Sequence, residues 1–185
     1  MRPALFARVF LSVGVAVALV VVGIAPPASA DDAFKKKVDD YADYDGQEKC
    51  RDKPREGTLG VVQILRVTFP KQARFSLMRA CDLGPRSEHK DGRAIDWMVN
   101  VNRPADREAA EDFIEYLTAK DVDGKKNAHL RRLGVMYIIW NKEILRSYEI
   151  KKGWEPYEGP NDHTTHMHIS LSPAGAEKRT SFWQR

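Results

Sequence analysis

Two short stretches of the chain, some seventy residues apart, hold four of its five histidines. The first stretch carries His89 and Asp96, and the second carries His163, His166 and His168. Zinc accepts imidazole nitrogens and a carboxylate oxygen as ligands, and a catalytic zinc ion keeps one position open for water. Calcium and magnesium prefer oxygen ligands instead. One histidine and one aspartate from the first stretch, with one histidine from the second, would therefore bind one zinc ion.

Two strands must bring these side chains to one face of a sheet. In residues 93–99 apolar side chains alternate with Asp96, which therefore points away from the core. In residues 166–171 apolar side chains alternate with His166 and His168 in the same way. The residues expected to enter the core from these strands are Ile95, Trp97, Val99, Met167, Ile169 and Leu171. A single histidine is usually an ordinary core or surface residue, but this combination favours a metal site.

A metal-activated water needs a neighbouring group to take its proton. His166 lies on the same strand face as His168, and His163 lies three residues earlier in a loop. Either residue is available for this role.

Helical periodicity predicts three helices that flank the strands. The first covers residues 32–44, the second is capped by Thr58 and ended by Pro70, and the third starts after Pro104. Their apolar faces consist of Phe34, Val38 and Tyr41, then Val61, Val62, Leu65 and Phe69, and then Ala110, Phe113, Ile114 and Leu117.

Further strands are expected over residues 135–140 and around Ile144 and Leu145. Helices and strands do not alternate in a strict βαβ rhythm. This order is typical of an α+β domain, an antiparallel sheet with flanking helices.

The first thirty residues have the features of a secretory signal peptide. Arginines near the start precede an apolar stretch over residues 11–24 and a small-residue Ala-Ser-Ala cleavage motif. An uncleaved membrane anchor is disfavoured, because the apolar stretch is shorter than the roughly 20 residues that span a membrane. We expect residues 1–30 to be removed and residues 31–185 to form one secreted domain, with its core at about 45–180.

Charge and cysteine content narrow the class further. The whole chain has a net charge of +4, and removal of the two signal-peptide arginines lowers it to +2. A chain with so little net charge and no basic stripe is unlike a nucleic-acid-binding protein, so a metal-dependent nuclease is disfavoured. Cys50 and Cys81 are the only cysteines, and they lack the CxxC spacing of zinc sites. In an exported protein we expect them to form a disulfide.

The pattern His-x6-Asp followed by His-x-His resembles the zinc metallopeptidases that include lysostaphin-type enzymes, D-alanyl-D-alanine carboxypeptidases and the hedgehog signalling domain. The wider Ser-x-His-x-x-Gly-x-Ala-x-Asp motif at residues 87–96 resembles the carboxypeptidase branch. Over about residues 45–180 the chain also resembles a set of secreted actinobacterial proteins of that fold. The resemblance implies that His89, Asp96 and His168 are the zinc ligands.

The resemblance also implies roles for the other histidines. The first histidine of the family's His-x-His pair acts in catalysis and corresponds to His166. Many D-alanyl-D-alanine carboxypeptidases have a catalytic glutamate where this chain has Thr165. The spacing of His163, His166 and His168 instead resembles that of penicillin-insensitive murein endopeptidases. We therefore expect His166 to be the general base and His163 to bind or stabilise the oxyanion.

Four further residues are candidates for substrate binding. Arg79, expected on a strand before His89, is suited to bind a substrate carboxylate, or is simply solvated or ion-paired. Ser87 is expected to order the loop that holds His89. Trp154 and Tyr157, in an aromatic loop over residues 151–162, would line the cleft or serve as ordinary packing.

These features predict a secreted, monomeric zinc peptidase that hydrolyses peptide bonds of peptidoglycan and is associated with the cell wall. The alternative is a zinc-containing module of the same fold that binds wall fragments or a protein partner without cleaving them. His163 and His166 favour the enzyme, because an inactive site has no need of a base.

Overall fold

The computed structural model describes residues 37–184, so the expected signal peptide lies outside the described residues. The strands are β1 (Phe75–Ser76), β2 (Ala94–Trp97), β3 (Val135–Trp140), β4 (Glu143–Arg146), β5 (Trp154–Pro156) and β6 (Met167–Leu171). The α-helices are α1 (Glu56–Thr68), α2 (Pro104–Thr118), α3 (Ala128–Leu133) and α4 (Pro173–Ala176), and the 3-10 helices are η2 (Pro70–Gln72) and η3 (Ser147–Lys152). Across the described residues, no helix has the length and apolar character needed to cross a membrane.

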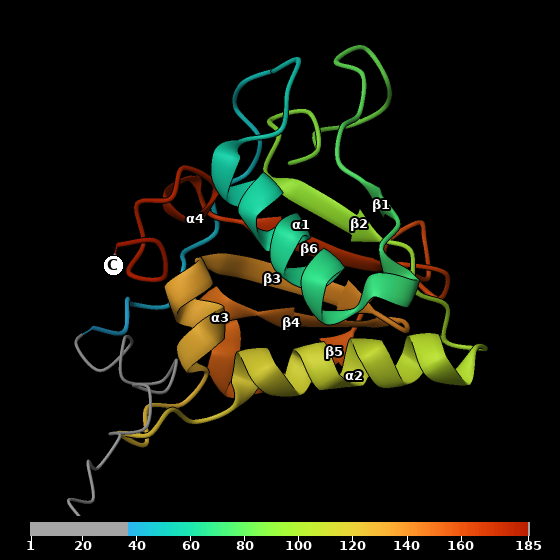
Figure 1. Ribbon diagram of the computed structural model, residues 1–185. Coiled ribbons are helices and arrows are strands. Elements are labelled where there is room, and N and C mark those ends of the chain that lie inside the picture. The colour runs from blue at the N-terminus through green and yellow to red at the C-terminus, as the bar shows by residue number, and fades with distance from the viewer. Residues whose placement is uncertain (1–36, 185) are drawn as a thin grey trace, which may run out of the picture.

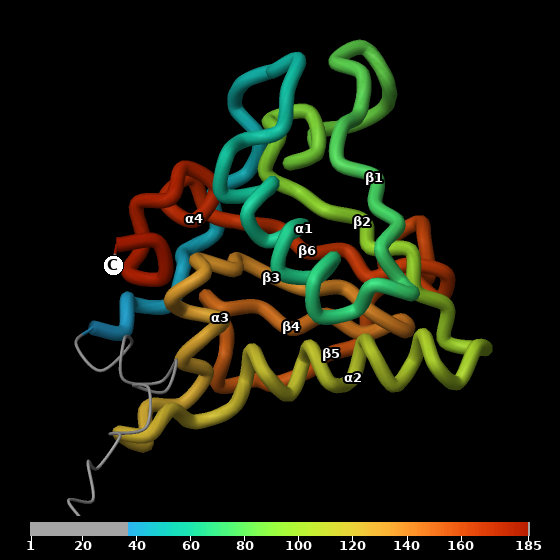
Figure 2. The backbone as a smooth tube through the Cα atoms, viewed as in Figure 1, coloured from blue at the N-terminus to red at the C-terminus, as the bar shows by residue number. Residues whose placement is uncertain are grey.

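The strands form one sheet in the order β1-β2-β6-β3-β4-β5, and every neighbouring pair is antiparallel. The predicted α+β class with an antiparallel sheet and flanking helices is thus confirmed. The last strand, β6, lies between β2 and β3, as the red segment in Figure 2 shows. This insertion brings the second histidine stretch beside the first.

The register of β6 sets the position of His168. Asp96 on β2 is its partner on one side, and Ile139 on β3 is its partner on the other. Paired residues on neighbouring strands project to the same face of a sheet. The two predicted ligands from the strands therefore lie side by side.

The opposite face of the sheet packs against the two longest helices. Figure 1 shows α1 and α2 on the same side of the sheet. The Trp97 side chain is completely buried there, and its ring lies 5.2 Å from that of Phe69 and 5.9 Å from that of Phe113. The Trp97 indole nitrogen donates a hydrogen bond to the Gln72 carbonyl at 2.8 Å. Alternation along β2 thus buries Trp97 under the helices and leaves Asp96 on the other face.

The predicted helix ends are partly correct. The third predicted helix corresponds to α2, with Pro104 in its first turn. The second corresponds to α1, which ends at Thr68, just before Pro70. Its predicted cap is wrong, because α1 begins at Glu56 and Thr58 lies inside it. The buried Thr58 hydroxyl instead donates to the carbonyl of Gly92 at 2.8 Å.

The helix predicted over residues 32–44 is wrong for its described part, which has no regular secondary structure. The carbonyls of Lys37 and Asp39 accept hydrogen bonds from the Arg132 and Arg131 side chains, at 3.1 and 2.6 Å. In a helix those carbonyls would be bonded within the segment. Both arginines belong to α3, a six-residue helix that the periodicity did not predict.

Candidate metal centre

Three of the predicted ligands converge on one point. His89 Nε2 lies 3.0 Å from Asp96 Oδ1, and His168 Nδ1 lies 2.9 Å from the same oxygen. The ligand atoms of the three residues all lie within 4.8 Å of one another. The group can therefore hold a metal ion.

The hydrogen bonds of His89 indicate which of its nitrogens is available to bind a cation in this group. His89 Nδ1 lies 3.0 Å from the Leu77 carbonyl oxygen, so this nitrogen carries the proton and donates. His89 Nε2 then presents a lone pair to the Asp96 carboxylate, and it is a buried atom without a hydrogen-bond partner. A lone pair and a carboxylate oxygen 3.0 Å apart repel each other unless a metal ion or a second ring proton lies between them. The residues fit a metal ion, and the Leu77 carbonyl orients the histidine that would bind it.

Asp96 remains ionised in this environment. Burial acts to raise the pKa of its carboxyl group, but the contacts with His168 and His89 outweigh burial and hold the pKa well below its ordinary value. Asp96 therefore supplies a negative charge at the centre of the group.

A tight turn over residues 88–92 presents His89. The Glu88 carbonyl accepts hydrogen bonds from the backbone nitrogens of Asp91 and Arg93, at 3.1 and 2.9 Å. Gly92 has a φ of +68°, and a Cβ atom there would lie 2.5 Å from the Lys53 carbonyl oxygen. The turn therefore requires glycine at this position.

A buried ion-pair network fastens this turn to the sheet. The fully buried Arg93 donates to Asp91 Oδ2 and to the carbonyl of Leu171, both at 2.8 Å. Arg55 donates to the other oxygen of Asp91 at 2.5 Å. Burial acts to raise the pKa of Asp91, but the hydrogen bonds from Arg93 and Arg55 lower it below 3.8. Asp91 thus joins the turn to the start of α1 and to β6.

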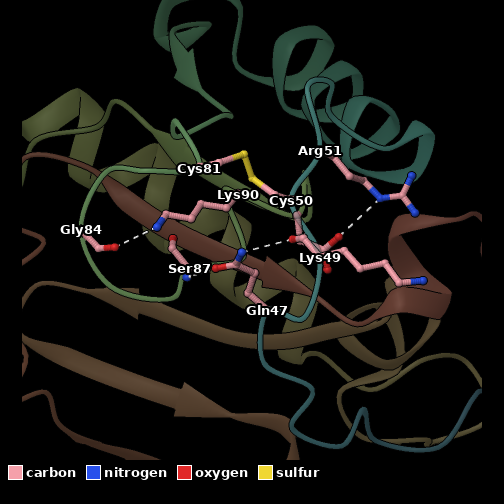
Figure 3. Close-up of a disulfide and its surroundings, with 9 residues drawn as sticks. Gln47, Lys49, Cys50, Arg51, Cys81, Gly84, Ser87 and Lys90 are labelled. Carbon is pink, nitrogen blue, oxygen red and sulfur yellow. Dashed lines mark hydrogen bonds and ion pairs between the residues drawn. A yellow bond between two sulfur atoms is a disulfide. The ribbon is translucent and has the colours of Figure 1, made fainter.

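The predicted disulfide between Cys50 and Cys81 is confirmed, with their Cα atoms 5.9 Å apart. Figure 3 shows that it links the segment before α1 to the loop between β1 and β2. Next to it, the Arg51 backbone nitrogen donates to the carbonyl of Lys90 at 2.8 Å, and Lys90 Nζ donates to the Gly84 carbonyl at 2.8 Å. These bonds hold the loop that leads to His89.

Ser87 lies in this loop, and its backbone groups order it. The Ser87 nitrogen donates to Gln47 Oε1 at 2.9 Å, and its carbonyl accepts from the nitrogen of Lys90 at 2.9 Å (Figure 3). The turn that contains His89 is thereby tied to the segment before the disulfide.

His166 lies beside the three ligands. Its Nε2 atom is 3.9 Å from Asp96 Oδ1, and its Nδ1 atom is 3.3 Å from the Thr165 hydroxyl. Burial is the main cause that lowers the pKa of His166. The imidazole is therefore neutral near pH 7 and has a nitrogen free to accept a proton.

His163 is held in an unusual backbone conformation, with a φ of 48°. Its nitrogen donates to Asn161 Oδ1 at 2.9 Å, and its carbonyl accepts from Asn141 in the β3–β4 turn at 3.0 Å. Non-glycine residues with positive φ are uncommon and persist where the surroundings fix them. The His163 ring consequently lies 4.8 Å from the His166 ring and 5.8 Å from the His168 ring.

The protonation of His163 follows from its contacts. Nδ1 lies 2.6 Å from the Asn161 carbonyl oxygen and therefore carries the proton. Burial first, and then the electrostatic effect of the neighbouring His168 ring, lower the pKa of His163 to about 4. At neutral pH its Nε2 atom is a hydrogen-bond acceptor. Oxyanion stabilisation needs a donor, so this geometry opposes the predicted oxyanion role and suits Nε2 to accept a hydrogen bond from a substrate.

The site opens into a cavity of about 390 Å³. Arg79, Ser87 and Tyr157 line it together with His163, His166 and His168, and the Tyr157 ring lies edge-on to His163 at 5.1 Å. The prediction that Arg79 lies on a strand is wrong, because Arg79 is exposed in the loop after β1. Trp154 does not line the cavity, because it belongs to β5 and packs against the hydrophobic core.

Comparison with known proteins gives one match. The profile of the family described as "VldE, C-terminal domain" matches residues 50–168, which is more than half of the chain. The chain belongs to the VldE C-terminal domain family. No curated protein and no solved structure matches it. The matched region includes His89, Asp96 and His168.

Two residues that were not predicted from the sequence, Glu88 and Tyr137, also line the cavity. The Tyr137 hydroxyl donates to Glu88 Oε2 at 2.7 Å, and its ring stacks on the His168 ring at 5.5 Å. Burial, and then the Glu88 carboxylate, raise the pKa of Tyr137 well above its ordinary value, so its proton remains in place. A polar residue inside the apolar strand 135–140 was the available signal. This signal could be interpreted only with the knowledge that β6, which carries His168, lies next to β3.

Proposed function

We propose that this protein is a secreted zinc-dependent peptidase that hydrolyses peptide bonds of cell-wall peptidoglycan. The observation that carries the proposal is the group of His89, Asp96 and His168, with neutral His166 beside it in an open cavity. The Cys50–Cys81 disulfide agrees with an oxidising compartment outside the cytoplasm.

The donor atoms support zinc as the metal. Two imidazole nitrogens and one carboxylate oxygen match the ligands of catalytic zinc sites, which retain a position for water. When bound, zinc would polarise the scissile carbonyl and make a water molecule acidic enough to react near neutral pH. The protein supplies the ligands through His89 Nε2, Asp96 Oδ1 and His168 Nδ1.

His166 is the general base in this proposal. Its Nε2 atom is 3.9 Å from the Asp96 oxygen at the centre of the ligand group, so it is adjacent to the reacting atoms. Because its pKa is lowered, the ring starts neutral and can take the proton of the attacking water. The same proton then passes to the leaving amine nitrogen.

His163 binds the substrate. With Nδ1 committed to the Asn161 carbonyl, Nε2 offers a lone pair to a backbone N–H group of a peptide in the cavity. Stabilisation of an oxyanion would require a second proton on the ring, which its low pKa opposes.

The test uses residues 31–185 incubated with purified peptidoglycan, with and without a chelator, followed by mass spectrometry of released fragments. We expect metal-dependent release of peptides. His168→Ala should lose the metal, whereas His166→Ala should keep it and lower hydrolysis by about 10²- to 10⁴-fold. His129→Ala is the matched control, because His129 lies in α3, outside the cavity.

Two outcomes would count against this proposal. Equal zinc content in wild type and His168→Ala would refute the ligand assignment. A protein that carries zinc and binds the wall but releases nothing would be a binding module of the same fold.

A further inference from the structure

The cavity contains a second carboxylate besides that of Asp96, namely Glu88, which is not one of the candidate metal ligands. Glu88 lines the cavity, although the residue is only 6% exposed. It does not belong to the group of His89, Asp96 and His168 that can hold a metal ion. Its place next to His89 in the chain nevertheless keeps it close to that group.

The Glu88 carboxylate is only partly satisfied by the protein. Tyr137 donates to Oε2 at 2.7 Å, and Oε1 accepts no hydrogen bond from the residues that the structure describes. Arg79 and Arg86 also line the cavity, but both are exposed and neither forms an ion pair with Glu88. Because the residue is largely buried, its carboxylate is poorly hydrated, and a cation that reaches it from the cavity would be bound more strongly than in bulk water.

Tyr137 fixes this carboxylate relative to the metal ligands. Its hydroxyl holds Glu88 Oε2, and its ring is stacked on His168 with an interplanar angle of 19°. The backbone of Glu88 is held by Asp91 and Arg93, whose nitrogens donate to its carbonyl. A group that binds Oε1 is therefore placed at a fixed position beside the site of bond cleavage.

Resting on the proposed function, we propose that Glu88 is a specificity-determining residue that binds an ammonium group of the peptide substrate. An ammonium group has three donors and a positive charge, so it both satisfies Oε1 and neutralises the buried carboxylate. The preferred substrates are peptides with a free amine near the cleaved bond. The amine belongs either to the N-terminus of the peptide or to a diamino acid side chain.

The experiment uses peptides in which lysine precedes two D-alanines, prepared with the α-amine, the side-chain amine, both or neither acetylated. Isothermal titration calorimetry measures their binding to zinc-loaded His166→Ala, in which hydrolysis is about 10²- to 10⁴-fold slower. The doubly acetylated peptide should bind about 10- to 100-fold more weakly than the peptide that keeps the recognised amine, as expected for one charge-assisted hydrogen bond. The two singly acetylated peptides identify which amine is recognised.

Glu88→Gln in the same background should abolish this preference at unchanged zinc content and thermal midpoint. Tyr137→Phe should weaken the preference without abolishing it, because it removes the hydroxyl that holds Oε2 but leaves the charge of Glu88 in place. A preference that survives in Glu88→Gln overturns the proposal. If Glu88→Gln fails to fold, equal affinities of all four peptides for the protein with Glu88 intact still overturn it.

Hydrolysis by the wild-type protein separates this proposal from the proposed function. An amine preference that depends on Glu88, without any cleavage, supports the ammonium site and refutes the peptidase. Cleavage that is indifferent to acetylation supports the peptidase and refutes the ammonium site. A uniform fall of kcat in Glu88→Gln, with unchanged KM for every peptide, would also refute the binding role.

Discussion

Asp91→Asn should strongly destabilise the turn that carries His89. Asp91 accepts hydrogen bonds from Arg93 at 2.8 Å and from Arg55 at 2.5 Å, and its side chain is only 6% exposed. Arg93 is completely buried and cannot exchange its lost partner for water. The substitution keeps the shape of the side chain and removes its charge.

The expected loss of unfolding free energy in Asp91→Asn follows from the burial of this ion pair. Removing one partner of a buried ion pair costs about 3 to 5 kcal/mol, because the remaining charge stays buried without compensation. For a domain of this size that corresponds to a fall of about 6 to 20 °C in the thermal midpoint. The carbonyls of Leu171 and Asp45 still accept from Arg93, so the folded state should persist.

Asp45→Asn provides the matched control. Asp45 Oδ1 lies 3.4 Å from the same Arg93 guanidinium, but its side chain is 47% exposed, so its loss should cost less than about 1 kcal/mol. Thermal and urea unfolding of both variants at pH 7 measure the difference. Equal losses would refute the argument from burial.

The pH dependence gives an independent check of the same reasoning. Because the folded pKa of Asp91 is below 3.8, its contribution to stability is present above that pH and is lost as the pH falls through the folded pKa. The gap in stability between wild type and Asp91→Asn should therefore narrow in acid. A gap that stays constant down to pH 2 would contradict the assignment.

Three other predictions concern the disulfide, the acid response and the metal. Replacing Cys50 and Cys81 by alanine should lower the unfolding free energy by about 3 to 4 kcal/mol, measured in urea, and unchanged stability would contradict this. In chelator-treated protein, stability should fall from pH 6.5 to about 4, because the folded pKa of His163 is about 4 and the unfolded chain takes up the proton more readily. His163→Gln should make this fall shallower by thermal unfolding, and an identical profile would refute the assigned pKa. Zinc at a thousandfold excess over its Kd should stabilise wild type by about 4 kcal/mol and Asp96→Asn much less, and equal midpoint shifts would exclude Asp96 as a ligand.

Local patterns in the sequence determined which side chains face the site. Side chains alternate along any strand, so Asp96 and His168 could be assigned to the polar faces without knowing the sheet. The end of α1 just before Pro70 and the start of α2 at Pro104 also followed from the sequence. Proline restricts the backbone of its own residue and of its neighbours, whatever the rest of the fold.

The predictions of local structure were wrong where distant segments supply other hydrogen-bond partners to the same groups. The carbonyls of Lys37 and Asp39 are taken by the side chains of Arg132 and Arg131, so a segment with helical periodicity is not helical. Thr58 faces the carbonyl of Gly92 across the fold and caps nothing. Propensity is a weak prior when tertiary contacts supply other partners.

The sequence by itself determined the types of the candidate ligands, their faces and the pairing of the two cysteines. Only the tertiary structure decided that β6 lies between β2 and β3, which places His168 beside Asp96 and Tyr137 over His168. It also decided that the Leu77 carbonyl fixes the proton of His89 and that Glu88 enters the cavity. Alternation depends on the local backbone alone, whereas strand order and loop closure depend on the packing of segments that are far apart in the chain.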